Sequence, residues 1–171
     1  TKDALVDKWR KLEGRRPDVN TLTPDVKVHV RIYNSEVTIS LDSSSDSLHR
    51  RGYRTHSVPA PINEVLAAGM ILLSGWDKKT TFLDPMCGSG TIAMEALTLA
   101  AGRPPQDKDR RFGFKQWRDF DNDLWDKVTD VEVDYSNLPK IIARDKGLRP
   151  LKATEMNIGH LSWLDYITVE K

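Results

Sequence analysis

The chain has 171 residues, of which 39% are hydrophobic and 30% charged, and its formal net charge is +1 at neutral pH. These values are typical of a globular protein with one domain or parts of two, and they exclude a fibrous or intrinsically disordered chain. No apolar run approaches the roughly 18 residues that cross a membrane. One cysteine excludes an internal disulfide framework. We therefore expect a protein of the reducing cytoplasm with no membrane partner.

The N-terminal part of the sequence predicts a helix followed by a β-hairpin. Apolar residues recur at helical spacing between positions 5 and 12. Residues 26–33 and 36–42 each alternate apolar and polar side chains, and only Asn34-Ser35 separates the two runs. This pattern is typical of two strands joined by a two-residue turn, with one face of the hairpin buried.

The C-terminal part alternates helical patterns with short apolar runs. The expected helices cover residues 62–74, 91–100 and 150–161, and the expected strands are a run that ends at Leu83, residues 140–144 and residues 166–169. A further short helix at 119–128 is expected to turn Phe120, Leu124 and Val128 inward. Strands that alternate with helices in this order predict a parallel sheet with right-handed crossovers.

Residues 80–102 place a glycine turn between an apolar strand and a helix. Gly88 and Gly90 allow the backbone to turn sharply and a ligand to approach closely, because they have no Cβ. The helix that follows directs its unpaired N–H groups and the positive end of its dipole at this turn. The turn therefore predicts a site for an anionic or hydrogen-bond-accepting ligand.

Three ligand classes compete for this turn. A phosphate-binding P-loop needs a lysine directly after its glycines, and none is present. A dinucleotide fold fits Gly88, Gly90 and Ala93, but its acidic ribose ligand lies about 20 residues on, whereas here the next strand ends much later, at Asp145. S-adenosylmethionine carries an ammonium for Asp84, a carboxylate for the glycine-turn N–H groups, and ribose hydroxyls for Asp145. We favour this ligand because these groups follow the carboxyl ends of parallel strands, where open α/β sheets bind ligands.

The glycine turn and the segment before it resemble a known family. The stretches "HSVPAPINEVLAAGMILLSGW" and "DPMCGSGTIAMEAL" are similar to the bacterial THUMP-containing methyltransferases of the large-ribosomal-RNA guanine-N2 type, also named N6-adenine-specific DNA methylases. The similarity extends to "RRFGFKQWRDFDNDLW", which resembles the family's insertion after the first helix, and to Asn157 in the helix after the second strand. It implies an α/β fold, in which a truncated class I (Rossmann-like) S-adenosylmethionine methyltransferase sheet is preceded by the C-terminal part of an α+β THUMP domain.

The resemblance also implies a domain division and a set of cofactor residues. Residues 1–56 would form the C-terminal part of a THUMP-like RNA-binding domain with its linker, and residues 57–171 the N-terminal part of the catalytic domain. The cofactor would be S-adenosyl-L-methionine, and the residues that match the family's binding positions are Asp84, Pro85, Cys87, Gly88, Ser89, Gly90, Thr91 and Asp145. Gly147 stands where the family carries a second acidic residue, so the ribose contact depends on Asp145 alone.

The activity that the resemblance implies is methylation of guanine N2 in 23S ribosomal RNA, with structured large-subunit RNA as the partner. Adenine-N6 methylation of DNA and an RNA-binding module without catalysis are the alternatives. The family's catalytic Asn-Pro-Pro-Tyr motif is absent, and the nearest look-alike, residues 136–139, predicts a turn before the second strand. Because the chain begins with Thr1 and ends in a strand, we expect a fragment that lacks catalytic residues and is inactive alone.

Two basic segments are candidates for RNA contact, because basic clusters with aromatic residues suit phosphates and bases. The candidates are Arg50, Arg51, Tyr53 and Arg54 in the first segment and Lys108, Arg110, Arg111, Lys115 and Arg118 in the second. A solvated linker is an equal interpretation of the first segment, and the aromatic residues of the second favour core packing. The four histidines show no metal-ligand spacing, so we expect no metal. Cys87 has no histidine near it and is expected to be a packing residue.

Overall fold

The computed structural model describes residues 2–171, which divide into two compact units. The first unit contains the chain up to Ser45 together with Arg111–Phe120, and the second contains Asp46–Arg110 and Asp121–Lys171. Among these residues, none of the helices has both the length and the apolar character needed to cross a membrane.

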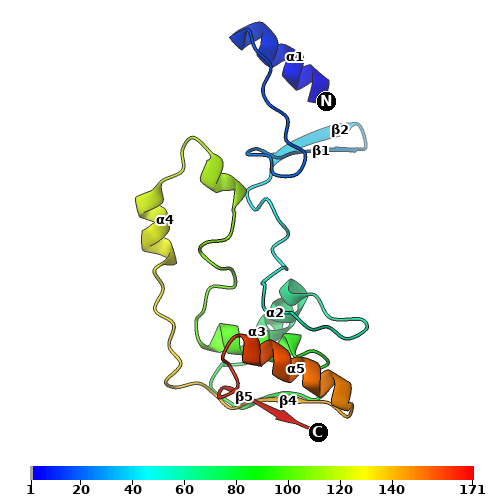
Figure 1. Ribbon diagram of the computed structural model, residues 1–171, viewed down its shortest axis with the longest axis vertical. Helices are drawn as coiled ribbons and strands as arrows, with labels where there is room; N and C mark the ends of the chain where they lie inside the picture. The colour runs from blue at the N-terminus through cyan, green and yellow to red at the C-terminus, as the bar shows by residue number, and fades with distance from the viewer. Residues whose placement is uncertain (1) are drawn as a thin grey trace. The chain divides into compact units, whose positions relative to one another are not determined.

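The first unit contains a helix and a two-stranded hairpin (Figure 1). Its elements are α1 (Lys2–Glu13), β1 (Val28–Tyr33) and β2 (Glu36–Leu41). The strands are antiparallel, and Asn34 and Ser35 form the predicted two-residue turn with positive φ values of 44° and 64°, as a type I′ turn requires. The prediction of a buried hairpin face is wrong, since every residue of both strands is exposed. Two strands alone lack the second layer that would cover a face.

The segment Arg111–Phe120 supplies aromatic packing to the first unit and contains the short helix η1 (Gly113–Gln116). Phe112 is buried, and its ring centroid lies 5.2 Å from that of Phe114. A Cβ at Gly113 would lie 2.6 Å from the Asp42 carbonyl oxygen, so the backbone approach here is possible only for glycine. The expectation that these aromatic residues pack within the protein is confirmed for Phe112.

The second unit contains a parallel sheet whose strands alternate with helices (Figure 1). Its helices are α2 (Glu64–Leu73), α3 (Thr91–Ala100), α4 (Asn122–Thr129) and α5 (Leu148–His160), and its strands are β3 (Phe82–Asp84), β4 (Ile141–Arg144) and β5 (Ile167–Glu170). The strand order is β3-β4-β5, and both strand pairs are parallel. The predicted parallel sheet is therefore confirmed.

The core of the second unit is built around α3. Its apolar residues Ala93, Met94, Ala96 and Leu97 are completely buried. Ile141 of β4 and Ile158 of α5 are equally buried and belong to the same cluster. This packing fixes the first turn of α3 against the sheet, which places the preceding glycine turn beside the carboxyl ends of β3 and β4.

The helix α4 forms where it was predicted, but its apolar residues do not face a core. Leu124 and Val128 are 57% and 58% exposed, so the expected inward orientation is wrong for these two residues. Phe120, which precedes the helix, is half-buried, and its ring centroid lies 5.8 Å from that of Phe114. The carboxylate of Asp121 accepts a hydrogen bond from the Leu124 N–H and thereby caps the helix. In the described structure, this helix buries none of its residues, and it gains little from packing.

Candidate cofactor site

The glycine turn connects β3 to α3 and is held by backbone hydrogen bonds. The N–H of Gly90 donates to the Cys87 carbonyl (2.8 Å), and the N–H of Cys87 donates to the Arg144 carbonyl (2.9 Å). Gly88 and Gly90 have positive φ values of 58° and 87°. A Cβ at Gly90 would also lie 2.8 Å from Cγ2 of Thr154 on α5. Both the backbone conformation and the contact with α5 therefore require glycine at position 90.

Asp84 is the last residue of β3 and is only 5% exposed. Its Oδ1 accepts a long hydrogen bond (3.4 Å) from the Met86 N–H, while Oδ2 is buried with no hydrogen-bond partner among the residues described. Burial raises the pKa of this carboxyl, and the charge of Asp145 adds to the rise. Leaving a carboxylate oxygen buried and unpaired is costly, so this position suits a cationic hydrogen-bond donor.

Asp145 directly follows β4, and its carboxylate joins two loops. Its Oδ2 accepts a hydrogen bond from the Gly88 N–H (3.1 Å), and its Oδ1 accepts one from the Gly147 N–H (2.8 Å). The carboxylate thereby links the glycine turn to the start of α5. Each carboxylate oxygen can accept a second hydrogen bond, and the residue is only partly buried, so it remains accessible to a hydroxyl donor.

Two polar side chains of α5 face the glycine turn, and both residues are 0% exposed. The hydroxyl of Thr154 donates to the Gly88 carbonyl (3.0 Å), and Nδ2 of Asn157 donates to the Ser89 carbonyl (3.0 Å). Residues three apart lie on the same face of a helix. The sequence alone predicts no contact for either side chain; the signal it offers is two polar residues on the apolar face of a helix.

Asn157 also binds a segment that lies far earlier in the chain. Its Oδ1 accepts hydrogen bonds from the N–H groups of Thr55 (2.9 Å) and His56 (2.8 Å), and its Nδ2 donates to the His56 carbonyl (2.8 Å). The backbone that leads into α2 is therefore held against the same side chain as the glycine turn.

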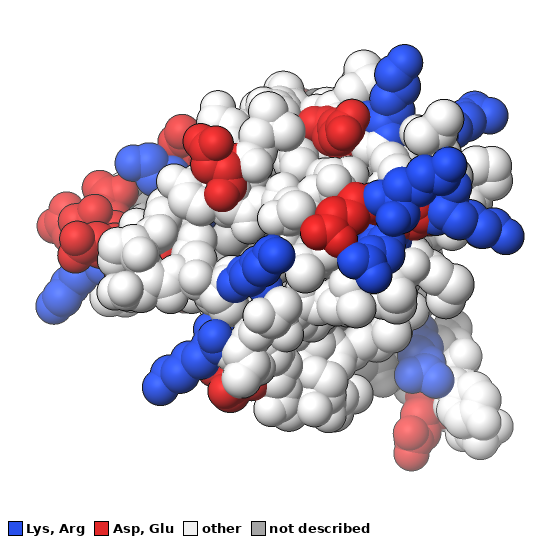
Figure 2. All heavy atoms as spheres, turned by 90° about the horizontal axis from the view of Figure 1, so that it is seen from below, with Lys and Arg blue, Asp and Glu red and all other residues white. Residues whose placement is uncertain are grey.

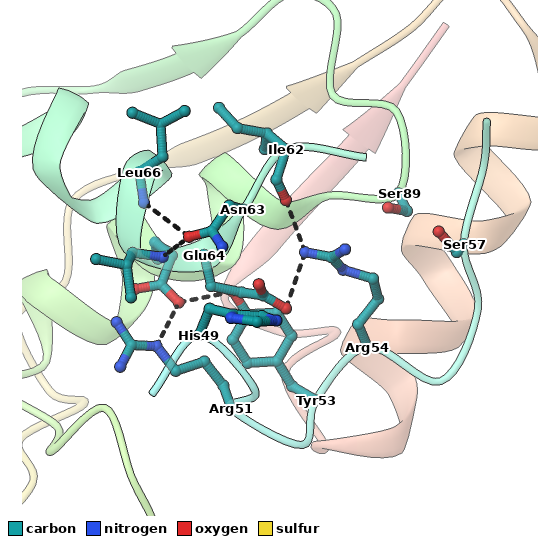
Figure 3. A network of polar contacts seen from close by, with 12 residues as sticks. His49, Arg51, Tyr53, Arg54, Ser57, Ile62, Asn63, Glu64, Leu66 and Ser89 are labelled. Carbon is teal, nitrogen blue, oxygen red and sulfur yellow. Dashed lines mark hydrogen bonds and ion pairs between the residues drawn. The ribbon is translucent and has the colours of Figure 1, made fainter. Parts of the chain in front are cut away.

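The residues just before this segment form a largely buried polar network (Figure 3). The Tyr53 hydroxyl donates to Oε1 of Glu95 on α3 (2.6 Å), and Nε of Arg51 lies 3.3 Å from the same oxygen. A guanidinium nitrogen of Arg54 lies 2.8 Å from Oε1 of Glu64 on α2. Burial raises the pKa of Tyr53 above its ordinary value, and the nearby charge of Glu95 raises it further.

This network corrects the interpretation of the first basic cluster. The side chains of Arg51 and Arg54 are 9% and 17% exposed, and Tyr53 is 5% exposed. Neither RNA contact nor a solvated linker fits these three residues, because each has a polar group engaged by a carboxylate of α2 or α3. Arg50 differs from them in being exposed.

A cavity of about 280 Å³ adjoins this network at the C-terminal end of α3, the end remote from the glycine turn. Its lining includes Tyr53, Glu95, Thr98 and Trp163. The guanidinium of Arg103, which also lines it, lies 5.1 Å from the Trp163 ring centroid. The cavity is thus separate from the carboxyl ends of the strands.

The second basic cluster is divided between the two units. The guanidinium of Arg110 donates to the carbonyls of Asp46 (2.6 Å) and Ser47 (3.2 Å), and that of Arg111 donates to the Thr23 carbonyl (3.1 Å). Nζ of Lys115 lies 5.9 Å from the Phe112 ring centroid, while Lys108 and Arg118 are exposed. Figure 2 shows one face of the molecule, on which basic and acidic side chains are interspersed among uncharged ones.

The remaining predicted site residues occupy the turn and its edges. Cys87 is 7% exposed, its Sγ lies 3.6 Å from the Thr154 hydroxyl, and burial raises its pKa to about 11, so its expected packing role is confirmed. Ser89 and Thr91 are buried and Pro85 is exposed. Residues 136–137 form a turn, as predicted. Within residues 2–171, no three potential metal-ligating side chains are grouped so that they could hold an ion.

The fold and the site together define a class of protein. A parallel sheet with a glycine turn after one strand, a buried acid before that turn and a second acid after the neighbouring strand is the Rossmann-like arrangement of class I methyltransferases. Residues 51–171 match the family model "RMKL-like, methyltransferase domain", and residues 1–42 match the model of the THUMP domain. The chain belongs to the RMKL-like methyltransferase family.

Curated relatives of the chain are much longer proteins. The ribosomal RNA large subunit methyltransferase K/L of Photobacterium profundum is 44% identical over 124 residues, which cover 72% of this chain and 17% of that protein. The protein of the same name from Colwellia psychrerythraea is 38% identical over 174 residues, covering 97% of this chain and 24% of the relative. The chain thus spans about a quarter or less of the length of these relatives.

Solved structures with the same fold cover nearly all of the chain. SMU.472, described as a methyltransferase and crystallised with SAH, has a TM-score of 0.84 at 31% identity, covering 99% of this chain and 45% of that one. A predicted N6-adenine-specific DNA methylase from Listeria monocytogenes has a TM-score of 0.80 at 31% identity, covering 99% of this chain and 44% of that one. The expected family and fold class are confirmed.

Proposed function

We propose that this chain is the cofactor-binding part of an S-adenosylmethionine-dependent methyltransferase that modifies a base in ribosomal RNA. The observation that carries the proposal is the buried, unpartnered Oδ2 of Asp84 beside the glycine turn. Support also comes from relatives that are named ribosomal RNA large subunit methyltransferase and from a similar structure that holds SAH. The proposal includes a cytoplasmic location and a division into two parts: the C-terminal part of a THUMP-like domain with its linker, residues 1–56, and the N-terminal part of the catalytic domain, residues 57–171.

The residues present fit the polar groups of this cofactor. Asp84 offers an unpaired carboxylate oxygen to the ammonium of the methionine moiety. Within the described chain, the Ser89 N–H has no hydrogen-bond acceptor, and the first N–H groups of α3 have none within their helix, so they suit the carboxylate. Asp145 can accept from the ribose hydroxyls. When bound, the cofactor supplies an activated methyl group on its sulfonium; the chain's residues hold and orient it.

We propose guanine N2 of 23S ribosomal RNA as the acceptor. The exocyclic amine is a weak nucleophile because its lone pair is delocalised into the ring, so the enzyme has to orient it toward the methyl group at short distance. Adenine N6 of DNA is the alternative, since a similar structure carries the name of an N6-adenine-specific DNA methylase. An RNA-binding module without catalysis is the alternative from a different class.

A methyl-transfer assay with the full-length protein tests the proposal. Radiolabelled S-adenosylmethionine is supplied with unmodified ribosomal RNA, with the same RNA already methylated at guanine N2, and with unmethylated DNA. We expect label only in the first RNA, and we expect Asp84→Ala to remove most of it. Label in DNA alone would favour the adenine alternative. RNA affinity without binding of S-adenosylmethionine would leave only the RNA-binding module.

Salt-dependent binding tests the proposed RNA partner. Affinity for structured RNA should fall steeply as salt rises, because the binding of phosphates releases counterions. Replacing the exposed Arg50 and Arg118 by alanine should reduce the slope of log K against log salt by about 1 for each phosphate that the variant no longer binds. Lys152→Ala in α5, an exposed cation outside both clusters and outside the THUMP-like part, is the control. An unchanged slope in the double variant would remove both residues from the RNA interface.

A further inference from the structure

We infer that Thr154 and Asn157 are positioning residues of the cofactor turn, and that Asn157 couples the geometry of this turn to the docking of the segment Tyr53–His56. The inference rests on the proposed function and deepens it. In this view, two side chains of α5 orient the N–H groups of the turn, and one of them also binds a segment that precedes α2.

The orienting effect follows from the geometry of the peptide group. In a trans peptide the carbonyl and the following N–H point in opposite directions. Thr154 binds the Gly88 carbonyl, and the Ser89 N–H therefore points away from α5. Asn157 binds the Ser89 carbonyl and so fixes the next peptide plane, whose N–H, that of Gly90, closes the turn onto the Cys87 carbonyl. Two consecutive peptide planes of the turn are thus set by one face of α5.

The coupling follows from the hydrogen-bond capacity of Asn157. A carboxamide has two N–H donors and an oxygen with two lone pairs. The donors bind the carbonyls of Ser89 and His56, and the oxygen binds the N–H groups of Thr55 and His56. Asn157 is 0% exposed, so in the folded protein its carboxamide is shielded from solvent by these partners. The full set of bonds forms only when both the turn and the segment are in place, and a coupling of this kind is reciprocal.

The segment Tyr53–His56 is also held by two side-chain contacts that do not involve Asn157. Tyr53 binds Glu95 on α3, and Arg54 binds Glu64 on α2 (Figure 3). These contacts bring the backbone of Thr55 and His56 to Asn157. A ligand that favours the native turn should therefore also favour the docked segment.

A matched pair of variants at position 154 tests the orienting role in the full-length protein. Thr154→Val keeps the shape of the side chain and removes the hydroxyl, whereas Thr154→Ser keeps the hydroxyl. Calorimetric titration with SAH should show about tenfold weaker binding for Thr154→Val and near wild-type binding for Thr154→Ser. A residue with only a structural role would change thermal stability and leave the SAH affinity of the folded protein unchanged.

Variants at position 157 test the coupling by amide hydrogen exchange. In the wild type, SAH should slow exchange of the Thr55 and His56 amides severalfold. In Asn157→Ala this slowing should disappear. Asn157→Asp keeps an acceptor for these amides and removes the donors to the Ser89 and His56 carbonyls. It should therefore retain part of their protection while its SAH affinity falls about tenfold.

The outcomes separate this inference from the proposed function. If wild-type protein binds SAH, and both Thr154→Val and Asn157→Asp bind it equally well, the positioning role is wrong and the proposed function stands. If the wild-type protein does not bind SAH, both fail. Should Asn157→Ala not fold, the absence of any SAH effect on the Thr55 and His56 amides of the wild type would still overturn the coupling.

Discussion

The hairpin β1–β2 and the helix α3 both have clear apolar patterns, yet their residues lie in opposite environments. Every residue of the two strands is exposed, whereas α3 buries most of its length, including the charged residue Glu95. In the second unit, the sheet and neighbouring helices provide layers on which α3 packs. The comparison shows that an apolar pattern predicts the element, while burial depends on the layers available to it.

Among the variants that test this comparison, removal of the Glu95 carboxylate is expected to have the largest effect on stability. Glu95→Ala would leave Arg51, with a side chain 9% exposed, without its buried partner and would also remove the acceptor of Tyr53. We expect a loss of about 3–5 kcal/mol in the free energy of unfolding, measured by urea denaturation. Glu170→Ala, which breaks an exposed pair with Arg144, is the control and should have little effect. Equal losses would contradict the difference between the two environments.

Truncation of one apolar side chain in each region makes the comparison direct. Leu97 on α3 is 0% exposed, and Ile39 on β2 is 68% exposed. We expect Leu97→Ala to lower the free energy of unfolding by about 2–5 kcal/mol through a buried cavity. Ile39→Ala should change it by less than about 0.5 kcal/mol. A large effect at Ile39 would show that the hairpin face is covered in solution.

Two glycines with positive φ values allow the stability cost of backbone strain to be measured separately from the cost of overpacking. A Cβ at Gly90 would lie 2.8 Å from Thr154, whereas a Cβ at Gly75 would meet nothing within 4 Å. Gly75→Ala should cost about 1 kcal/mol from conformational strain alone. Gly90→Ala adds overpacking and should cost about 3 kcal/mol, and it should also weaken SAH binding. Thermal unfolding measures both variants, and equal losses would rule out the contact with α5 as a cause.

Removal of the Asp84 charge is expected to have the opposite sign and to stabilise the protein slightly. Burial raises the pKa of Asp84 in the folded state, so ionisation of Asp84 opposes folding, and the penalty appears as the pH rises through the folded-state pKa. Asp84→Asn should therefore stabilise the ligand-free protein by about 1 kcal/mol at pH 7. The same variant should bind SAH more weakly. A variant that is less stable at pH 7 would show that Oδ2 has a stabilising partner.

The elements of the second unit could be predicted because their signals are local. The glycine turn, the helix after it and the short apolar runs each lie within a few residues of one another. The partners of the first basic cluster are not local: Tyr53 and Glu95 are 42 residues apart in sequence. Taken alone, the stretch "RRGYR" contains only three arginines, a glycine and one aromatic residue, so it predicts a solvent-exposed segment.

The contacts of Asn157 illustrate the same limit within the candidate site. The resemblance placed an asparagine in the helix after the second strand, but its bond to the His56 N–H joins residues 101 apart in sequence. Asp84 and Asp145 can be predicted from the sequence, since each follows an apolar run that predicts a strand. Side chains whose role is to hold other backbone groups leave no pattern of their own in the sequence.

Helix α3 begins without a side-chain cap, unlike α2 and α4. At the start of α2, the Asn63 side chain accepts hydrogen bonds from two N–H groups, and Asp121 does the same for one N–H of α4. Gly90 precedes α3 and has no side chain to serve in this way. Glycine at an N-cap costs only about a few tenths of a kcal/mol relative to serine or aspartate, but it leaves the first N–H groups of α3 without a side-chain acceptor. A carboxylate bound there would act as a removable helix cap, and its dissociation would loosen the same turn of helix that its binding had completed.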